Sequence, residues 1–350
     1  MDGIDEATVT AWLEANTPPI QAPLEFQLIA GGRSNLTFLV SDATGRKVVL
    51  RRPPVSHVLA SAHDMGREHK IISALRDSPV PVPVALGFCD DVEVNGAPFY
   101  VMDFVEGHIL RGREQAEKVF DVEHRRVAGD DLVDVMVALH SLDPDQVGLG
   151  DLGKKEDYIG RQLRRWHGQF QGSQEQEKEA GVHRPADIVT EVHDLLVAKK
   201  PAQQGAVIAH GDYRLDNCMF GDDGKVVAVL DWELCTLGDP LADLGTMLIY
   251  WTDRGESARA GFPAASTAAG FPTRAELAAR YADRSDLDLD PLPYYMAFGH
   301  WRLACIMEGV FVRYATGAMG GGEEARQASL GMGGEVIRRA GMAKDLLDTL

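Results

Sequence analysis

The chain contains little cysteine and has no long apolar run. Four cysteines are present, at Cys89, Cys218, Cys235 and Cys305. They are widely separated and form no CxxC pair, so we expect free thiols in a reducing cytoplasm and no cysteine-based zinc site. No apolar run approaches the roughly 18 residues of a transmembrane helix. The acidic residues near the start differ from the positively charged start of a secretory signal, and we expect a cytoplasmic protein with no membrane partner.

The chain also lacks an excess of positive charge. It has 350 residues, with 35 lysines and arginines against 53 aspartates and glutamates, and a formal net charge of −18. Nucleic acids and anionic membranes attract basic surfaces, so neither is expected as the main partner. The hydrophobic content of 45% and the charged content of 25% are those of an ordinary globular protein. At about 150 residues per domain, this length predicts about two domains or lobes.

The two parts of the chain have different periodicities. The first hundred residues contain candidate strands at 24–29, 36–41, 47–52 and 99–105, with a helix at 61–75. The remainder has helical periodicity around 132–142, 159–170, 188–198 and 294–314. It is interrupted by a short strand at 206–208, a hairpin at 218–230 and a candidate surface loop at 255–272. We therefore expect a small β-rich lobe, a larger helical lobe and a ligand-binding cleft between them.

One short pattern in the second part carries chemistry. The residues His210-Gly211-Asp212 are followed after four positions by Asn217, and Asp231 stands at the end of the next apolar strand. A hairpin would bring Asn217 and Asp231 together as an amide oxygen and a carboxylate, which are ligands that suit Mg²⁺. Asp212, on the same loop, would accept a proton from an incoming hydroxyl. This division of roles is that of phosphoryl transfer from ATP by kinases.

These residues resemble the aminoglycoside phosphotransferase superfamily, whose members have a protein-kinase-like fold. The pattern HGDxxxxN at 210–217 and the segments 230–233 and 238–244 carry the resemblance, which extends over nearly the whole chain. It implies an α+β, bilobal fold with a nucleotide-binding lobe at 1–105 and a catalytic and acceptor-binding lobe at 106–350. Four segments look closest to the phosphotransferase domains associated with acyl-CoA dehydrogenases, at 50–54, 67–69, 161–166 and 302–306.

The resemblance also implies nucleotide contacts in the first lobe. The loop over the ATP phosphates corresponds to Gly31, Gly32, Ser34 and Asn35. Arg51 takes the place of a phosphate-binding lysine, and Glu68 is the ion-pair partner that would fix it. Arg52 is adjacent, so the choice between the two arginines stays open. Adenine would be bound by backbone groups of a hinge that includes Asp103 and Val105.

Other polar residues near these motifs have structural interpretations. His210 is expected to brace the loop by hydrogen bonding, and Asp216 to be a local turn residue. Asp239 and Asp243 are expected to accept hydrogen bonds from loop N–H groups. Two interpretations stay open for a basic segment, which is either a solvated helix face or a grip on an anionic substrate. This segment comprises Arg161, Arg164 and Arg165.

We therefore expect a small-molecule kinase that uses ATP and Mg²⁺ to phosphorylate a hydroxyl group. The closer resemblance implies a hydroxyacyl-CoA or a related hydroxy compound as the acceptor. An aminoglycoside kinase and a choline or sugar kinase are the alternatives in the same reaction class. A nucleotide-binding regulator without turnover is the alternative in another class, and the acceptor-facing carboxylate of Asp212 argues against it. The sequence does not indicate the oligomeric state.

Overall fold

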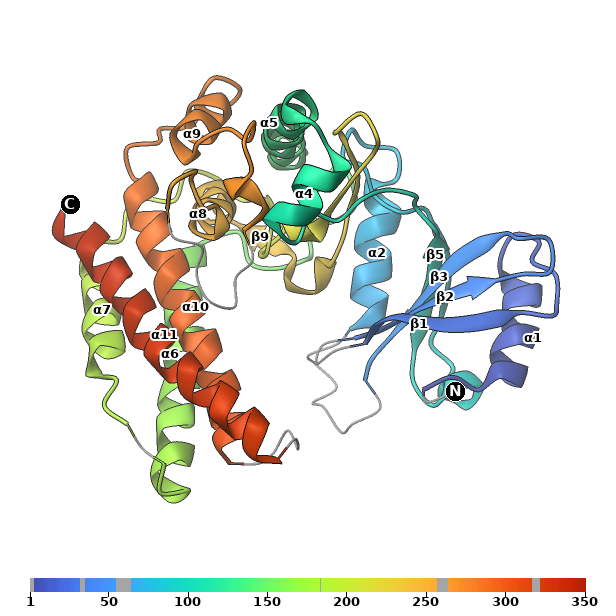
Figure 1. Ribbon diagram of the computed structural model, residues 1–350, viewed down its shortest axis with the longest axis horizontal. Helices are drawn as coiled ribbons and strands as arrows, with labels where there is room; N and C mark the ends of the chain where they lie inside the picture. Colours follow the sequence, from blue (N-terminus) through green and yellow to red (C-terminus); the bar gives the residue numbers. More distant parts are fainter. Residues whose placement is uncertain (1–2, 32–34, 55–63, 183, 257–263, 317–321) are drawn as a thin grey trace.

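The amino-terminal lobe is built on an antiparallel sheet. The computed structural model describes residues 3–31, 35–54, 64–182, 184–256, 264–316 and 322–350. Within these residues the sheet has five strands in the spatial order β1-β2-β3-β5-β4 (Figure 1). The strands are β1 (Glu25–Gly31), β2 (Leu36–Ser41), β3 (Lys47–Arg52), β4 (Ala85–Cys89) and β5 (Phe99–Asp103). Helix α3 (Val92–Asn95) joins β4 to β5.

Two helices cover opposite faces of this sheet (Figure 1). Helix α1 (Glu6–Asn16) packs on one face, where Phe38, Leu50 and Val101 belong to its apolar cluster. Helix α2 (Met65–Leu75) lies on the other face, between the sheet and the helical lobe. Side chains alternate across a strand, so neighbouring residues of β3 point to different helices. The face toward α2 belongs to the same continuous apolar cluster as the helical lobe.

The carboxy-terminal lobe is mainly helical. Helix α10 (Leu292–Ala315) lies at its centre and contacts helices α6, α7, α8 and α11. The buried side chains Tyr294, Phe298 and Trp301 fill this centre. The other helices are α4 (Arg113–Val119), α5 (Val122–His140), α6 (Tyr158–Glu179), α7 (Asp187–Ala198), α8 (Pro240–Tyr250), α9 (Arg274–Ala282) and α11 (Gly322–Asp348).

Two short antiparallel strand pairs lie where the helical lobe meets the sheet. Strand β6 (Val207–Ala209) pairs with β9 (Thr236–Gly238), and β7 (Cys218–Phe220) pairs with β8 (Val226–Val229) as the predicted hairpin. Single 3₁₀ turns occur at Leu215–Asn217, Trp232–Leu234 and Ala265–Thr267. The α+β, bilobal fold expected from the sequence is thus confirmed. The lobe boundary at residue 105 remains a prediction.

Some predicted boundaries are wrong. Helix α2 begins at Met65 because Asp64 caps it, accepting a hydrogen bond from the Arg67 N–H at 2.9 Å, and residues 61–63 of the predicted helix lie outside the described residues. Strand β5 ends at Asp103 rather than at residue 105. The predicted surface loop at 255–272 is partly interior, because Ala265 and Ala268 are buried.

The structure also bears on the few cysteines of the sequence and on its lack of long apolar runs. All four cysteines are buried there and have free thiols. No helix in these ranges combines the length and apolar content needed to span a bilayer.

Candidate active site

The segment that follows β6 is held rigidly from both sides. The Asp243 carboxylate, buried on α8, accepts hydrogen bonds from the N–H groups of His210 (2.6 Å) and Gly211 (2.8 Å). The buried Arg302 of α10 donates to the Gly211 carbonyl. A side chain at position 211 would place its Cβ 2.6 Å from the Leu234 carbonyl oxygen, and the backbone has a positive φ of 86° there, so glycine is required.

His210 braces this segment as the sequence predicted. Its Nε2 lies 2.9 Å from the Leu230 carbonyl, and its Nδ1 accepts the Asp212 N–H at 3.2 Å. These two contacts define a neutral imidazole whose proton is on Nε2. The ring is fully buried, so both nitrogens serve the loop.

Asp212 is oriented by two neighbours on the same loop. Its Oδ2 accepts hydrogen bonds from Asn217 Nδ2 at 2.9 Å and from Arg214 Nε at 3.2 Å. Asn217 Nδ2 also donates to the Asp212 carbonyl at 2.8 Å. Both donors hold the carboxylate in one orientation, and the side chain keeps 20% of its surface exposed. Asp212 therefore remains open to a molecule outside the loop.

Asp231 is brought beside Asn217 by the hairpin. The Leu230 N–H donates to the Asn217 carbonyl at 2.9 Å, which continues the β7–β8 pairing to the point where Asp231 begins. Asp231 has a left-handed backbone with a φ of 65°, a conformation that non-glycine residues rarely adopt. Such strain is typical of functional positions, where the surrounding structure holds the residue in place.

Arg51 connects the two lobes at this point. Its Nε lies 3.0 Å from Glu68 Oε2, and its Nη2 lies 2.5 Å from Asp231 Oδ1. Burial acts to lower the pKa of Arg51, but the charges of Glu68 and Asp231 and the Tyr100 hydroxyl raise it above its usual value. The guanidinium therefore stays charged. The predicted Arg51–Glu68 ion pair is confirmed.

Glu68 is the centre of a buried hydrogen-bond network. Its Oε2 accepts the Tyr100 hydroxyl at 3.0 Å, and its Oε1 accepts Asn35 Nδ2 at 3.0 Å. Asn35 Nδ2 also lies 3.3 Å from Glu233 Oε2 on the other lobe. Burial raises the pKa of the Glu68 carboxyl, and Arg51 opposes that rise. The Asn35 amide thus faces Glu68 and Glu233, and its predicted phosphate contact stays a prediction.

The choice between the adjacent arginines follows from the pleat of β3. Arg51 faces α2 and the other lobe, whereas Arg52 points toward α1. Arg52 Nη1 donates to the carbonyls of Gly3 and Asn95, the latter at 3.0 Å. Arg51 is therefore the arginine beside Asp231.

A cleft of about 620 Å³ lies between the lobes and is lined by five of the predicted site residues, while Asp212 is not among its lining residues. Its apolar lining comes from both lobes and includes Ile29, Leu39, Val49, Met102, Phe104, Met219 and Leu230. Arg51, Asn217 and Asp231 line it with polar groups, and the hinge residues Asp103 and Val105 line it as well. The Asp103 N–H donates to the Val84 carbonyl at 2.9 Å, so that N–H is not open to a base. An apolar wall beside a charged patch suits a nucleotide.

Only part of the predicted phosphate loop belongs to the described residues. Gly31 is the last residue of β1 and pairs with Leu36. Gly32 and Ser34 lie outside the described residues.

The donor set at the cleft fits Mg²⁺. In the ranges described above, no three histidine, cysteine, aspartate or glutamate side chains form a metal-binding group. Mg²⁺ needs no such group, since it is usually bound through one or two protein oxygens together with water and phosphate oxygens. Asn217 uses its Nδ2 to hold Asp212, which leaves the Oδ1 as the atom suited to a cation beside Asp231.

Three charged residues at the site were not predicted to act there. Arg214 bonds Asp212 and also pairs with Asp216 at 2.8 Å, so Asp216 is more than a turn residue. Asp216 lines the cleft, where burial raises the pKa of its carboxyl. Glu233 accepts from Asn35 across the lobes. The position of Arg214 and Asp216 inside the HGDxxxxN pattern was the available signal, because the loop that carries Asp212 also carries them.

The structural roles predicted for Asp239 and Asp243 are confirmed. Asp239 caps α8 by accepting the Leu241 N–H at 3.1 Å, and Asp243 accepts the two loop N–H groups described above. Burial acts to raise the pKa of Asp243, but hydrogen bonds from His140 and Gly211 hold it below its ordinary value.

The arginines of the basic segment of α6 already contact neighbouring groups of the protein. Arg161 donates to the Lys154 carbonyl at 2.6 Å, and Arg164 pairs with Asp157 at 3.1 Å. The Arg165 guanidinium lies over the Trp166 ring at 5.2 Å. These contacts fit a solvated helix face.

Comparison with known proteins gives consistent matches. The sequence model of the "Phosphotransferase enzyme family" matches residues 25–279. The mouse protein named acyl-CoA dehydrogenase family member 10 is 34% identical over 299 residues, which cover 84% of this chain and 27% of that protein. The chain spans between 27% and 40% of the length of the curated relatives it matches.

Solved structures share the fold over the whole chain. A Ralstonia eutropha JMP134 protein, whose assignment as an aminoglycoside phosphotransferase is provisional, superimposes with a TM-score of 0.81 at 29% identity and covers 99% of this chain and 98% of its own. The aminoglycoside phosphotransferase APH(4)-Ia, as a thermostable mutant bound to AMP-PNP and hygromycin B, has a TM-score of 0.59 at 17% identity and covers 95% and 99%.

Proposed function

Because this chain belongs to the phosphotransferase enzyme family, we propose that it transfers the γ-phosphoryl group of ATP to a hydroxyl of a small molecule. The observation that carries the proposal is that Asn217 and Asp231 line a cleft that Arg51 enters from the other lobe, while Asn217 also holds the Asp212 carboxylate by a hydrogen bond of 2.9 Å. A protein that only binds nucleotide has no need of an oriented carboxylate on the acceptor side.

In the proposed reaction Asp212 positions the acceptor and takes its proton. The acceptor oxygen forms a bond to the γ-phosphorus, the bond from that phosphorus to the bridging β-γ oxygen breaks, and ADP leaves. The hydroxyl proton passes to the Asp212 carboxylate. Asn217 and Arg214 keep this carboxylate aimed, since both donate to its Oδ2. Most of the rate enhancement in such reactions comes from positioning and charge neutralisation.

In this proposal Arg51 binds the phosphates of ATP. The loop that carries Gly31, Gly32, Ser34 and Asn35 binds them as well. Glu68 holds Arg51 in place through the buried ion pair. The Asn217 Oδ1 and the Asp231 carboxylate would hold Mg²⁺, which neutralises phosphate charge when bound. The hinge at Asp103 and Val105 would bind the adenine. The AMP-PNP complex of the structurally similar APH(4)-Ia supports ATP as the donor.

We propose a hydroxyacyl-CoA or a related hydroxy compound as the acceptor. The support is the match to part of an acyl-CoA dehydrogenase family member. An aminoglycoside kinase is the first alternative, favoured by the fold shared with hygromycin-bound APH(4)-Ia. A choline or sugar kinase and a regulator without turnover are the others. Four buried, free thiols support a reducing location such as the cytoplasm.

Substitution of Asp212 tests the reaction. Asp212→Asn keeps the size and hydrogen-bonding capacity of the side chain but removes its basicity. We expect turnover to fall about 10²- to 10⁴-fold, the usual contribution of a general base, with the affinity for nucleotide retained. Product formation is measured by mass spectrometry across hydroxyacyl-CoAs, aminoglycosides and choline, and nucleotide affinity by calorimetry.

Two further variants complete this test. Asp231→Asn should weaken nucleotide binding only when Mg²⁺ is present. Asp194→Asn, an exposed aspartate on α7, is the matched control and should leave both quantities unchanged. Near-normal turnover of a folded Asp212→Asn protein would contradict the role of Asp212, and nucleotide binding without transfer to any acceptor would favour the regulator.

A further inference from the structure

A second, smaller cavity adjoins the nucleotide cleft. It has a volume of about 210 Å³ and lies between the segment after β5, the loop that carries Asp212, the end of α8 and the turn at Ala265–Thr267. Its apolar lining consists of Leu110, Leu215, Met247, Trp251, Ala264 and Ala265. This volume is about a third of that of the nucleotide cleft. An apolar cavity of about 150 Å³ holds one benzene, so this cavity suits a group of roughly six carbon atoms.

The two cavities meet at two charged residues. Arg111 and Asp216 line both of them. Arg214 spans from Asp216 (2.8 Å) to Asp212 (3.2 Å), so the second cavity is separated from the Asp212 carboxylate by one guanidinium. Asp212 itself lines neither cavity, and a group bound in the second cavity would have the Arg214 guanidinium between it and the Asp212 carboxylate.

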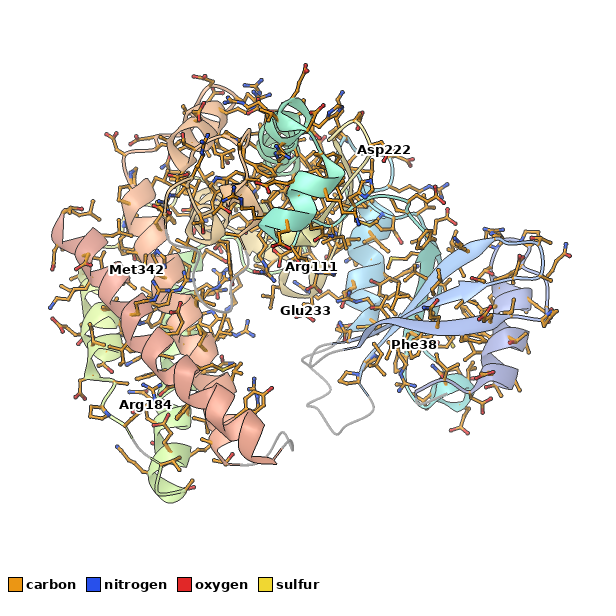
Figure 2. The ribbon with its side chains drawn as sticks, in the orientation of Figure 1. Phe38, Arg111, Arg184, Asp222, Glu233 and Met342 are labelled. Atoms are coloured by element: carbon orange, nitrogen blue, oxygen red, sulfur yellow. The ribbon has the colours of Figure 1, made fainter. Side chains whose placement is uncertain are left out.

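The two arginines at this junction differ in how far neighbouring carboxylates neutralise their charge. Arg214 is neutralised by two carboxylates and lies over the Tyr250 ring at 4.7 Å. Arg111 is exposed, and in the described part of the chain its guanidinium makes no ion pair, although its charge acts on the nearby Asp216 carboxyl. Figure 2 shows Arg111 on the side of the helical lobe that faces the amino-terminal sheet. Arg111 also lines an outer groove of about 710 Å³, together with Arg254 and Ala264.

The outer groove also has an excess of positive charge that is not neutralised by ion pairs. Of its two acidic residues, Glu256 is paired with Arg274, and one of its arginines, Arg113, is paired with Glu117 at 2.8 Å. Arg111 and Arg254 then face one carboxylate, that of Glu114. On a chain with a net charge of −18, a groove with a surplus of arginine beside the site is unusual and favours anions.

We propose that the acceptor has a short aliphatic hydroxy part, which fills the second cavity, and an anionic group, which pairs with Arg111 at its mouth. This inference rests on the proposed function and narrows its substrate class. A carboxylate on a free hydroxy acid and the phosphates of a CoA thioester are two sources of such an anion. A polycationic aminoglycoside fits neither the size of the cavity nor the charge of Arg111.

The test compares matched acceptors in the full-length protein. Hydroxyalkanoates of four to six carbons are supplied as free acids, as neutral methyl esters and as CoA thioesters, and kanamycin serves as the polycation. We expect transfer to at least one anionic form with a kcat/KM at least tenfold above that of the methyl ester. Preference for the free acid or for the thioester identifies the source of the anion.

Substitution of Arg111 separates acceptor recognition from other roles. Arg111→Gln should raise the KM for the anionic acceptor by about 10- to 100-fold, the cost of a lost charge-assisted hydrogen bond or two, and should leave the KM for the methyl ester unchanged. Arg111→Lys should restore part of the loss. Arg76→Gln, another exposed arginine, is the control and should change nothing. Binding of the acid in the presence of AMP-PNP, followed by calorimetry, gives a readout without turnover.

Three outcomes would overturn the inference. Equal loss of kcat for charged and neutral acceptors in Arg111→Gln would mean that Arg111 contacts the transferred phosphoryl group instead. Preferential phosphorylation of kanamycin or of the neutral esters would leave the proposed kinase function intact but reject the anionic acceptor. No transfer to any acceptor, despite nucleotide binding, would reject the proposed function and this inference with it.

Discussion

Two buried glutamates share one arginine in the helical lobe. Glu177 of α6 and Glu308 of α10 are both fully buried. Arg184 donates to the Glu308 carboxylate and, through its backbone N–H, to Glu177 Oε2 at 3.3 Å, and Gln174 donates to Glu308 as well. Burial, with the neighbouring Glu177 carboxyl, raises the pKa of Glu308 to about 8, although Arg184 opposes the rise. One proton is therefore retained by this pair at neutral pH.

This retained proton predicts a pH dependence of stability. The unfolded chain releases it near the ordinary glutamate pKa of 4.5, whereas the folded chain holds it to about pH 8. The free energy of unfolding should therefore fall as the pH rises through this window. Glu308→Gln, whose amide does not titrate, should make this decline shallower, as measured by urea unfolding between pH 5 and 8.5.

An exposed glutamate provides the control for this measurement. Glu191→Gln on α7 removes a surface pair with Lys344 and should keep the wild-type slope. Identical slopes for Glu308→Gln and the wild type would show that Glu308 is ionised in the folded protein.

At the scale of single residues, the sequence was informative where a fixed spacing specified the chemistry. Asp212, Asn217 and Asp231 were predicted together because their separation fits one loop and one hairpin. The choice between Arg51 and Arg52 could not be made, since it depends on which face of β3 meets α2. Arg111 gave no signal, because its role depends on two cavities that only the folded chain forms.

At the scale of elements, α8 and α10 approach so closely that their backbones touch. A Cβ added at Gly245 of α8 would lie 2.8 Å from the Tyr295 carbonyl carbon of α10. The Tyr295 hydroxyl also donates to Asp239 at 2.7 Å, at the start of α8. Because α8 carries Asp243, this packing contact sets the position of the loop with Asp212.

Substitution of this glycine should therefore destabilise the protein. We expect Gly245→Ala to lower the free energy of unfolding by about 1–3 kcal/mol, the cost of overpacking, although alanine is the better helix former. Gly172→Ala on α6, where the added Cβ meets nothing within 4 Å, should instead raise it by up to about 1 kcal/mol. Denaturant unfolding measures both, and a stabilised Gly245→Ala protein would refute the close contact.

Elements with strong local patterns were predicted well. The strands at 36–41 and 47–52 have the predicted bounds, the first of them expected from its alternation of apolar and polar residues. Helix α6 extends to Glu179 and does not end at residue 170 as predicted. The prediction stopped too early because the polar second half of the helix has no apolar periodicity. Strand β9 was missed, since a three-residue strand is defined only by its partner β6, far away in the sequence.

At the scale of the whole molecule, α2 fastens one lobe to the other. Arg67 Nη2 donates to the carbonyls of Leu152 (2.6 Å) and Cys235 (2.8 Å) in the helical lobe. Lys70 of the same helix pairs with Asp151, but both side chains are largely exposed. The Arg67 contacts therefore account for more of the fixed geometry of the cleft.

Loss of Arg67 should weaken nucleotide binding without touching the nucleotide. Arg67→Ala removes two charge-assisted hydrogen bonds, and we expect the Kd for Mg²⁺–AMP-PNP to rise roughly tenfold, about 1.4 kcal/mol. Lys70→Ala, which removes a surface pair of about 0–1 kcal/mol, should have little effect. Calorimetry measures both, and unchanged affinity in Arg67→Ala would show that the lobes hold their geometry by apolar packing alone.

The bilobal arrangement could be predicted because strand-rich and helix-rich patterns are segregated along the chain. The contacts by which α2 connects the two lobes could not be predicted. Arg67 donates to backbone carbonyls, and the residue types at 152 and 235 do not indicate such a contact. The sheet order β1-β2-β3-β5-β4 also depends on long-range pairing rather than on local pattern.

The contact between Arg51 and Asp231 makes the cation and the nucleotide depend on each other. A divalent ion that arrives alone must draw Asp231 away from a mostly buried guanidinium. A polyphosphate that arrives alone meets an arginine already neutralised and a carboxylate that repels it. When both arrive together, each supplies the countercharge that the other displaces. Mg²⁺ and ATP should thus bind with positive cooperativity, each raising the affinity for the other by the same factor.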